Sequence, residues 1–104
     1  MNSALVSIIV QCYNASSYIK ETINSVLTQT FQNFEILVIN DGSKDDSSHI
    51  IKTIKDDRIH LIEQENQGVS FSRNKGIALA KGKYVVFLDA DDLLHQSFLE
   101  KKDF

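Results

Sequence analysis

The sequence has a single cysteine and no apolar run long enough to cross a membrane. Because Cys12 has no second cysteine to pair with, the chain can form neither an internal disulfide nor a thiolate zinc site, which fits a reducing cytoplasm. A spanning helix needs ~18 apolar residues, whereas the first apolar run covers only residues 4–10 and follows no basic segment. We therefore expect this run to be a strand rather than a signal peptide or a membrane anchor.

Basic clusters and glycine-rich phosphate loops are also absent. Lysine and arginine are scattered, the formal net charge is −3 and the isoelectric point is near 5.5, which argues against a nucleic-acid partner. Neither a Walker-type P-loop nor a G-x-G-x-x-G segment follows the first apolar run, so NTPase and dinucleotide functions lose their main support. Phosphates on a ligand would have to be neutralised in another way, and a metal held by carboxylates is the expected one.

The composition predicts one domain over residues 1–104, since 42% of the residues are hydrophobic and 24% are charged. Apolar runs rich in β-branched residues alternate with segments of helical periodicity. This alternation predicts an α/β fold with an open, mainly parallel sheet, helices on both faces and right-handed crossovers. The expected strands are residues 4–10, 34–39, 58–63 and 84–88, and the expected helices include residues 19–30, 50–54, 69–80 and 98–104.

The strands differ in how strongly they are expected to be buried. Residues 34–39 are almost continuously apolar, as in a strand covered on both faces, and residues 84–88 also indicate a buried strand. Residues 58–63 alternate more weakly, as at the edge of a sheet.

Caps and one glycine give local expectations for the helices. Ser16 or Ser17 can cap the first helix, and Ser43 with Asp46 forms a plausible capping box for the second. Gly76 inside the third helix costs roughly 1 kcal/mol relative to alanine, so we expect the backbone to approach another part of the protein closely there.

Unusual polar residues gather where the expected strands end. They occupy residues 11–14, 40–43, 63–67 and 89–92. The carboxyl ends of parallel strands meet at one edge of a sheet, and ligands of open α/β sheets bind at that edge. A single crevice could therefore gather all four loops.

Asp89, Asp91 and Asp92 place three carboxylates within four positions at the end of an apolar strand. Oxygen ligands of this kind suit Mg²⁺ or Mn²⁺, which commonly share their remaining positions with phosphates and water. Aspartates at this place can equally serve as turn or helix-cap residues. The residues alone leave both alternatives open.

The other candidates have ordinary explanations when taken singly. Asp41 precedes a glycine and is more often a turn residue than a ligand contact. Arg73 on a helix is usually a solvated charge, and Tyr13 and Tyr18 are more often packing residues than stacking platforms. Their common placement near one sheet edge is what favours a binding site.

Four short motifs occur in order along the chain. They are V-S-I-I-V-x-x-Y-N at residues 6–14, I-N-D-G-S at 39–43, N-Q-G-V-S-x-S-R-N-x-G at 66–76 and L-D-A-D-D at 88–92. Together they resemble the family 2 glycosyltransferases, which are inverting enzymes of the GT-A fold, and the resemblance covers essentially the whole chain. It implies a Rossmann-like half with sheet order 3-2-1-4, in which the order reverses between the first and fourth strands.

The resemblance implies a nucleotide-sugar donor site in which the last motif is the D-x-D of the family. Asp91 would bind a divalent metal, Mn²⁺ or Mg²⁺, on the diphosphate, and Asp89 would contact the ribose or assist the metal. Ala90 would lie against the same nucleotide sugar, and Asp92 would help to orient the other two carboxylates.

The resemblance also implies where the nucleobase lies. Tyr13 and the backbone beside it, at Gln11 and Asn14, would hold the base together with Asp41, and Arg73 would lie near the nucleotide and the diphosphate. The base is most often uracil in the family, so the expected partner is a UDP-sugar.

Enzymes of this family carry an acceptor-binding half after the D-x-D, including the carboxylate that acts as general base. The sequence therefore resembles a single truncated donor-binding domain, with the general base expected beyond residue 104 and with a glycan or lipid-linked acceptor that the sequence does not identify. We expect a cytoplasmic location, at the inner face of a membrane for a longer parent protein.

Two alternatives belong to other functional classes. The chain could be a non-catalytic nucleotide-binding module that acts through dimerisation, as a homodimer. A receiver-type phosphoacceptor domain shares the doubly wound architecture, but it needs acidic residues after its first strand, where this chain has Gln11, Cys12 and Tyr13.

Overall fold

Strands and helices alternate along residues 4–102, the part of the chain described by the computed structural model. In chain order the elements are β1 (Val6–Cys12), α1 (Ile19–Leu27), β2 (Phe34–Asp41), α2 (Ser47–Thr53), β3 (Ile59–Gln64), α3 (Val69–Leu79) and β4 (Tyr84–Asp89). The predicted α/β class is confirmed.

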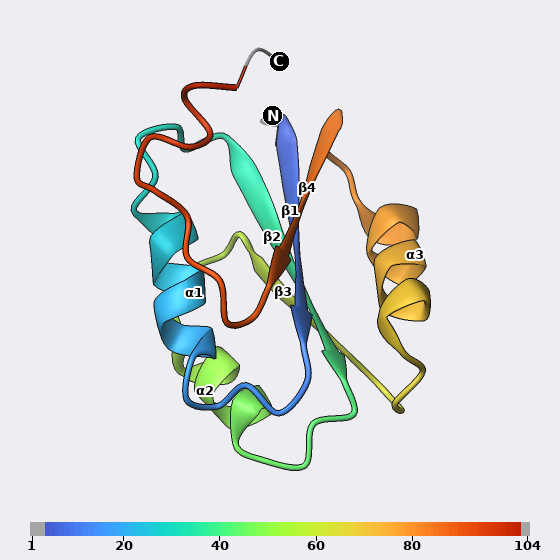
Figure 1. Cartoon of the computed structure of the whole chain (residues 1–104). Helices are drawn as coiled ribbons and strands as arrows, with labels where there is room; N and C mark the ends of the chain where they lie inside the picture. Colours follow the sequence, from blue (N-terminus) through green and yellow to red (C-terminus); the bar gives the residue numbers. More distant parts are fainter. Residues whose placement is uncertain (1–3, 103–104) are drawn as a thin grey trace.

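The four strands form one parallel sheet in the order β3-β2-β1-β4 (Figure 1). β1 lies inside the sheet, and its Ile9 is in register with Leu37 of β2 on one side and with Phe87 of β4 on the other. The order therefore reverses between β1 and β4, as the resemblance implied. This is the switch point at which an open α/β sheet leaves a crevice.

Helices cover both faces of the sheet. α1 and α2 lie on one face and α3 on the other (Figure 1). Alternation along β1 divides the core, because Ile8 and Val10 pack with α1 whereas Ile9 packs in a smaller cluster with Leu37 and Ile39. Every residue of β2 is buried, which confirms the prediction that this strand is covered on both faces.

β4 differs from its prediction as a buried strand. It is an edge strand, and only the side chains on the α1 face, such as Leu88, are covered. On the other face Val85 and Phe87 remain 36% and 41% exposed. The physical reason is that α3 packs over β1 and β2 and does not reach this face of β4. The composition of β4 is that of a buried strand, but no helix covers its second face. β3 lies at the opposite edge, as predicted.

The residues predicted as helix caps have other roles. α1 begins after Tyr18 rather than after the serines at positions 16 and 17, and α2 begins after Asp46, in both cases without a side-chain cap bond. The predicted capping box is therefore wrong. Ser43 Oγ accepts a hydrogen bond from the backbone N–H of Asn14 instead, because the loop after β1 needs partners for its own backbone groups.

The helix expected at residues 98–104 is also not formed within the described residues. Residues 96–101 form turns, and residues 103–104 lie outside the described part. Side-chain bonds hold this segment against the end of α1: Leu99 N–H donates to Gln29 Oε1, and Gln29 Nε2 donates to the carbonyl of His95. These tertiary bonds, together with burial of Leu99, replace a helical ladder.

Gly76 is the point of close approach between α3 and the sheet. A Cβ atom added there would lie 2.6 Å from Cγ2 of Ile9, whose side chain is fully buried. The predicted close approach is confirmed, and the neighbour is the side chain of Ile9.

We predict that Gly76→Ala lowers the free energy of unfolding by about 1 kcal/mol, because overpacking of a core costs more than the helix propensity that alanine gains. Urea denaturation measures this change. Asn74→Ala, at an exposed position of the same helix, is the control and should leave stability unchanged or slightly raised. A Gly76→Ala protein as stable as that control would contradict the packing account.

Candidate functional site

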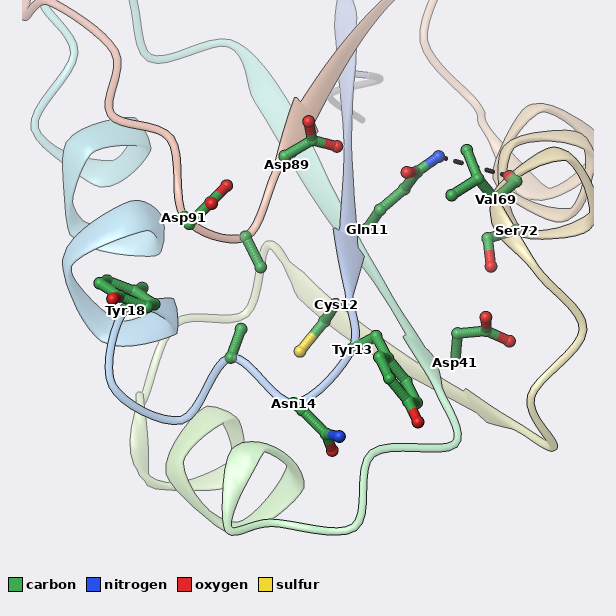
Figure 2. Close-up of a pocket in the computed structure, with 12 residues that line it drawn as sticks. Gln11, Cys12, Tyr13, Asn14, Tyr18, Asp41, Val69, Ser72, Asp89 and Asp91 are labelled. Atoms are coloured by element: carbon green, nitrogen blue, oxygen red, sulfur yellow. Dashed lines mark hydrogen bonds between the residues drawn. The ribbon is translucent and has the colours of Figure 1, made fainter.

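A pocket of about 370 Å³ lies at the carboxyl edge of the sheet, between the ends of β1 and β4 and the start of α3 (Figure 2). Its lining residues are Gln11, Cys12, Tyr13, Asn14, Ala15, Tyr18, Asp41, Val69, Ser72, Asp89, Ala90 and Asp91. The polar strand ends therefore converge on one crevice, as the sequence predicted.

Most of the predicted site residues line this pocket. They are Gln11, Tyr13, Asn14, Asp41, Asp89, Ala90 and Asp91. Arg73 does not: its guanidinium lies over the ring of Phe87, 5.2 Å from the ring centroid, on the exposed face of β4. Its role toward a nucleotide remains a prediction.

Other lining residues were not singled out by the sequence as part of a site. Ser72 is buried on the inner side of α3, and Val69 is the first residue of that helix. Cys12 is buried, and this burial raises the pKa of its thiol. Both Val69 and Ser72 belong to the motif at residues 66–76, and helical periodicity could have placed Ser72 on the inner side of α3, but no site role was assigned to either residue.

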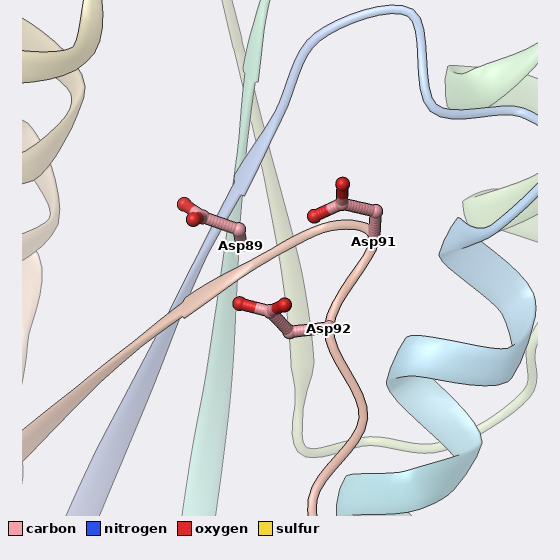
Figure 3. A group of neighbouring side chains, drawn as sticks. All are labelled: Asp89, Asp91 and Asp92. Carbon is pink, nitrogen blue, oxygen red and sulfur yellow. The ribbon is translucent and has the colours of Figure 1, made fainter.

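Asp89, Asp91 and Asp92 form a cluster of exposed carboxylates (Figure 3). One oxygen of each lies within 4.8 Å of an oxygen of the others. Within residues 4–102 no helix starts directly after these aspartates, because residues 92–95 have no regular structure. They therefore do not act as helix caps. No ion pair recorded for residues 4–102 involves them. Three uncompensated carboxylate oxygens at this spacing fit a hard divalent cation.

Three hydrogen bonds hold the turn that carries these carboxylates, one of them within the turn itself. Ala90 N–H donates to the carbonyl of Gln11 at 3.0 Å, and Asp92 N–H donates to the carbonyl of Asp89 at 2.9 Å. From the other face, buried Thr22 of α1 donates its hydroxyl to the carbonyl of Ala90 at 2.6 Å. Because Thr22 looks like an ordinary helix residue, sequence reasoning missed it as a positioning residue.

Gln11 and two exposed tyrosines also border the pocket. Gln11 is in register with Asp89, and its Nε2 donates to the carbonyl of Val69 at 3.4 Å, which joins the strand to the start of α3. Tyr13 is 49% exposed and Tyr18 is 55% exposed. The two rings are thus not the packing residues expected from each tyrosine alone, and both are available to a ligand.

Asp41 is a buried carboxylate that holds the loop after β3. Oδ1 accepts from Gln64 Nε2 at 2.9 Å and from the backbone N–H of Gln67 at 2.7 Å, while Oδ2 accepts from Gly68 N–H at 3.0 Å. Partial burial by itself would raise the pKa of Asp41, but these hydrogen bonds outweigh it and hold the pKa below its usual value. Asp41 therefore lines the pocket and also orders the loop after β3, which forms one wall. Its role thus goes beyond that of the turn residue expected from the Asp-Gly pair alone.

Asn14 joins the loop after β1 to the loop after β2. Its own N–H donates to Ser43 Oγ at 2.9 Å, and its Oδ1 accepts from Lys44 N–H at 2.8 Å. The backbone of Asn14 has a φ of 49°, in the left-handed region that asparagine tolerates better than most residues.

Asp45 completes the same junction. It accepts from Ser16 N–H at 3.1 Å and from Ser47 N–H and hydroxyl at 3.0 and 2.5 Å, while Ser47 Oγ accepts from Ala15 N–H. Desolvation acts to raise the pKa of Asp45, but the bonds from Ser47 and Ser16 dominate and hold the pKa at about 2. These bonds fix the pocket floor formed by the loop after β1.

The fold and pocket define an α/β protein of the GT-A type. Residues 7–101 match the family model described as glycosyl transferase family 2. The chain is 44% identical over 97 residues to the glycosyltransferase GlyA of Streptococcus pneumoniae and 38% identical over 101 residues to GlyG of the same organism. These matches cover 91% and 94% of the chain. The chain therefore belongs to glycosyltransferase family 2.

Solved structures with the same fold hold nucleotide sugars. Staphylococcus aureus TarS residues 1–349 in complex with UDP-GlcNAc match with a TM-score of 0.86 at 30% identity, over 96% of this chain and 29% of that one. The Pyrobaculum calidifontis mannosyltransferase PcManGT in complex with GDP-Man and Mn²⁺ matches with a TM-score of 0.82 at 26% identity, over 92% of this chain and 30% of that one.

The relatives are much longer than this chain. It spans 14% of GlyA and 34% of GlyG. Within residues 4–102, none of the helices has the length and apolarity needed to cross a membrane.

We predict that Asp45→Ala lowers the free energy of unfolding at neutral pH by about 1 kcal/mol or less, because the lost hydrogen bonds are charge-assisted but exposed to solvent. The folded pKa is about 2, below the ordinary value. The contribution of Asp45 is thus present above about pH 4 and lost as the pH falls toward the folded pKa.

Urea denaturation at a series of pH values measures this difference. Asp46→Ala is the matched control, since the neighbouring side chain is exposed and caps nothing. If Asp45→Ala lowered the free energy of unfolding by the same amount at the most acidic pH as at neutral pH, the stabilising role of the ionised Asp45 carboxylate would be contradicted.

Proposed function

We propose that this chain is the donor-binding part of an inverting glycosyltransferase that uses a UDP-sugar together with Mn²⁺ or Mg²⁺. The observation that carries the proposal is one pocket lined both by Asp89 and Asp91 and by Tyr13 and Asp41. An acidic end suits a metal-bound diphosphate, and an exposed ring beside a buried carboxylate suits a nucleobase.

The acidic end has the carboxylates that could bind the cation of a metal-bound diphosphate. We assign Asp91 and Asp89 as metal ligands and Asp92 as the carboxylate that orients them, since the three bring oxygens within 4.8 Å of one another. A bound divalent cation would supply charge stabilisation for the leaving diphosphate. The chain contributes the fixed turn: Thr22 and Gln11 hold Ala90, so the carboxylates stand at the mouth of the pocket before a ligand arrives.

The base end is assigned to the residues opposite. We infer that the ring of Tyr13 stacks on the base, that Asp41 accepts a hydrogen bond from it and that the loop at Gln11 and Asn14 borders it, as the resemblance implies. Arg73 would approach the nucleotide only by leaving the ring of Phe87, where it now lies.

Transfer itself is proposed for a longer protein. The chain spans only 14% of the glycosyltransferase GlyA and 34% of the glycosyltransferase GlyG. We assign no general base to residues 1–104. We propose that the acceptor half and its catalytic carboxylate lie outside this sequence, that the acceptor is a glycan or lipid-linked molecule, and that the protein acts in the cytoplasm at the inner face of a membrane.

A second candidate function is a binding module that acts as a homodimer. The exposed apolar side chains of Val85 and Phe87 on β4 favour it, because adjoining exposed apolar residues mark protein–protein contact surfaces. The backbone of β4 also forms an edge of the sheet, and an unpaired edge can pair with a strand of another chain. Sedimentation equilibrium separates the two: the donor-binding role predicts a monomer, and a stable dimer that binds nucleotide would favour the module.

The central prediction is that Asp91→Ala abolishes the metal-dependent part of UDP binding, because it removes one of the ligands for the cation that links protein and diphosphate. Calorimetric titration with UDP in the presence and absence of Mn²⁺ measures it. Asp57→Ala, an exposed aspartate outside the pocket, is the control and should keep the manganese-dependent gain in affinity. If wild-type affinity is the same with and without Mn²⁺, the metal–diphosphate assignment is wrong.

A further inference from the structure

The segment that carries the aspartate cluster of Asp89, Asp91 and Asp92 has little secondary structure to hold it. It leaves β4, an edge strand, and residues 92–95 form no regular structure. The cluster nevertheless brings three carboxylate oxygens within 4.8 Å of one another. Like charges at this spacing repel, and an unsupported segment would relieve the repulsion by opening. Contacts from outside the segment are therefore needed to keep the cluster together before a cation binds.

One turn of α1 supplies two such contacts. Thr22 donates its hydroxyl to the carbonyl of Ala90 at 2.6 Å. Ser25 Oγ accepts from the backbone N–H of Leu94 at 3.1 Å. Because Thr22 and Ser25 are three positions apart, they share one face of the helix. The two hydroxyls therefore bracket residues 91–93, which include two of the three carboxylates.

The surroundings of the two hydroxyls favour these contacts. Thr22 is fully buried, so water does not compete for its hydroxyl. Ser25 donates its own proton to the carbonyl of Thr22 at 2.7 Å, which leaves its oxygen free to accept from Leu94. The remaining bond to the sheet, from Ala90 N–H to the carbonyl of Gln11, joins two backbone groups. Side-chain substitution can therefore remove the contacts of α1 and leave the contact with β1 in place.

We propose that Thr22 and Ser25 are positioning residues that preorganise the aspartate cluster for a divalent cation. This inference rests on the proposed function, and it makes metal affinity depend on a helix that provides none of the proposed metal ligands. With both hydroxyls present, Asp91 and Asp92 are held near Asp89, at the end of β4, before the cation binds. Without either hydroxyl, the metal-free segment can open, and binding has to close it again, which weakens the affinity.

The test is calorimetric titration of the 104-residue chain with UDP, in the presence and absence of Mn²⁺, which measures the gain in affinity that the metal provides. Thr22→Val keeps the shape of the side chain and removes its hydroxyl, and Ser25→Ala removes the acceptor for Leu94 N–H. Each should lower the manganese-dependent gain by about fivefold, the effect expected for one hydrogen bond, and leave UDP affinity without metal unchanged. Thr22→Ser keeps a hydroxyl at the same position and should retain the wild-type gain.

Gln29→Met is the matched control. Gln29 is a buried residue of the segment that follows α1, and it holds the chain after the cluster through hydrogen bonds with His95 and Leu99. Its loss should lower the free energy of unfolding but leave the manganese-dependent gain unchanged, because these bonds lie beyond the bracketed residues. Urea denaturation of every variant separates a loss of stability from a loss of metal affinity.

The possible outcomes separate this inference from the proposed function. A reduced gain in Thr22→Val and Ser25→Ala, with a retained gain in Thr22→Ser and Gln29→Met, supports the inference. A wild-type gain in Thr22→Val or in Ser25→Ala would overturn it and leave the proposed function standing. An equal reduction in Gln29→Met or in Thr22→Ser would also overturn it, since metal affinity would then not depend on the two hydroxyls. If Mn²⁺ gives the wild-type chain no gain in UDP affinity, the metal–diphosphate assignment is refuted, and the inference with it.

Discussion

The pairing of β1 with β2 on one side and with β4 on the other is the constraint on which the site depends. Because all three strands are parallel and in register, their carboxyl ends meet at one edge, and the order reverses at β1. Neighbouring loops must then leave the sheet in different directions, which opens a crevice without any further device. Residues far apart in sequence, such as Tyr13 and Asp89, line the same pocket for this reason.

The aspartates around that crevice divide into two kinds. Asp41 and Asp45 accept several hydrogen bonds from loop backbone, their pKa values are lowered, and each ties two loops together. Asp89, Asp91 and Asp92 are exposed and enter no recorded ion pair within residues 4–102. The first kind builds the walls of the pocket, and the second presents charge to whatever enters it.

Much of this could be predicted from the sequence, because it depends on local patterns. Periodicity located the strands, and polar residues at the strand ends located the pocket. Features that depend on tertiary contacts were not predictable. The apolar composition of β4 indicated burial, but burial depends on whether α3 reaches that strand, and the turns at residues 96–101 depend on a contact with Gln29.

The site residues also divide into those that a local sequence pattern indicates and those that only tertiary contacts reveal. The carboxylates of the L-D-A-D-D motif could be identified because clustered charge is unusual in any sequence. Thr22 and the contacts of Gln64 could not, since a threonine in a helix has no unusual pattern and the polar run at residues 63–67 does not show which groups Gln64 faces. Their importance arises from which groups they face, and only the folded structure supplies that.

The measurement that tests the account most directly is a crystal structure of this chain soaked with UDP and Mn²⁺, with the metal located by its anomalous scattering. The account predicts a manganese peak at the carboxylates of Asp89 and Asp91, with the diphosphate on it and the uracil between Tyr13 and Asp41. A manganese peak or a nucleotide bound away from this pocket would contradict it.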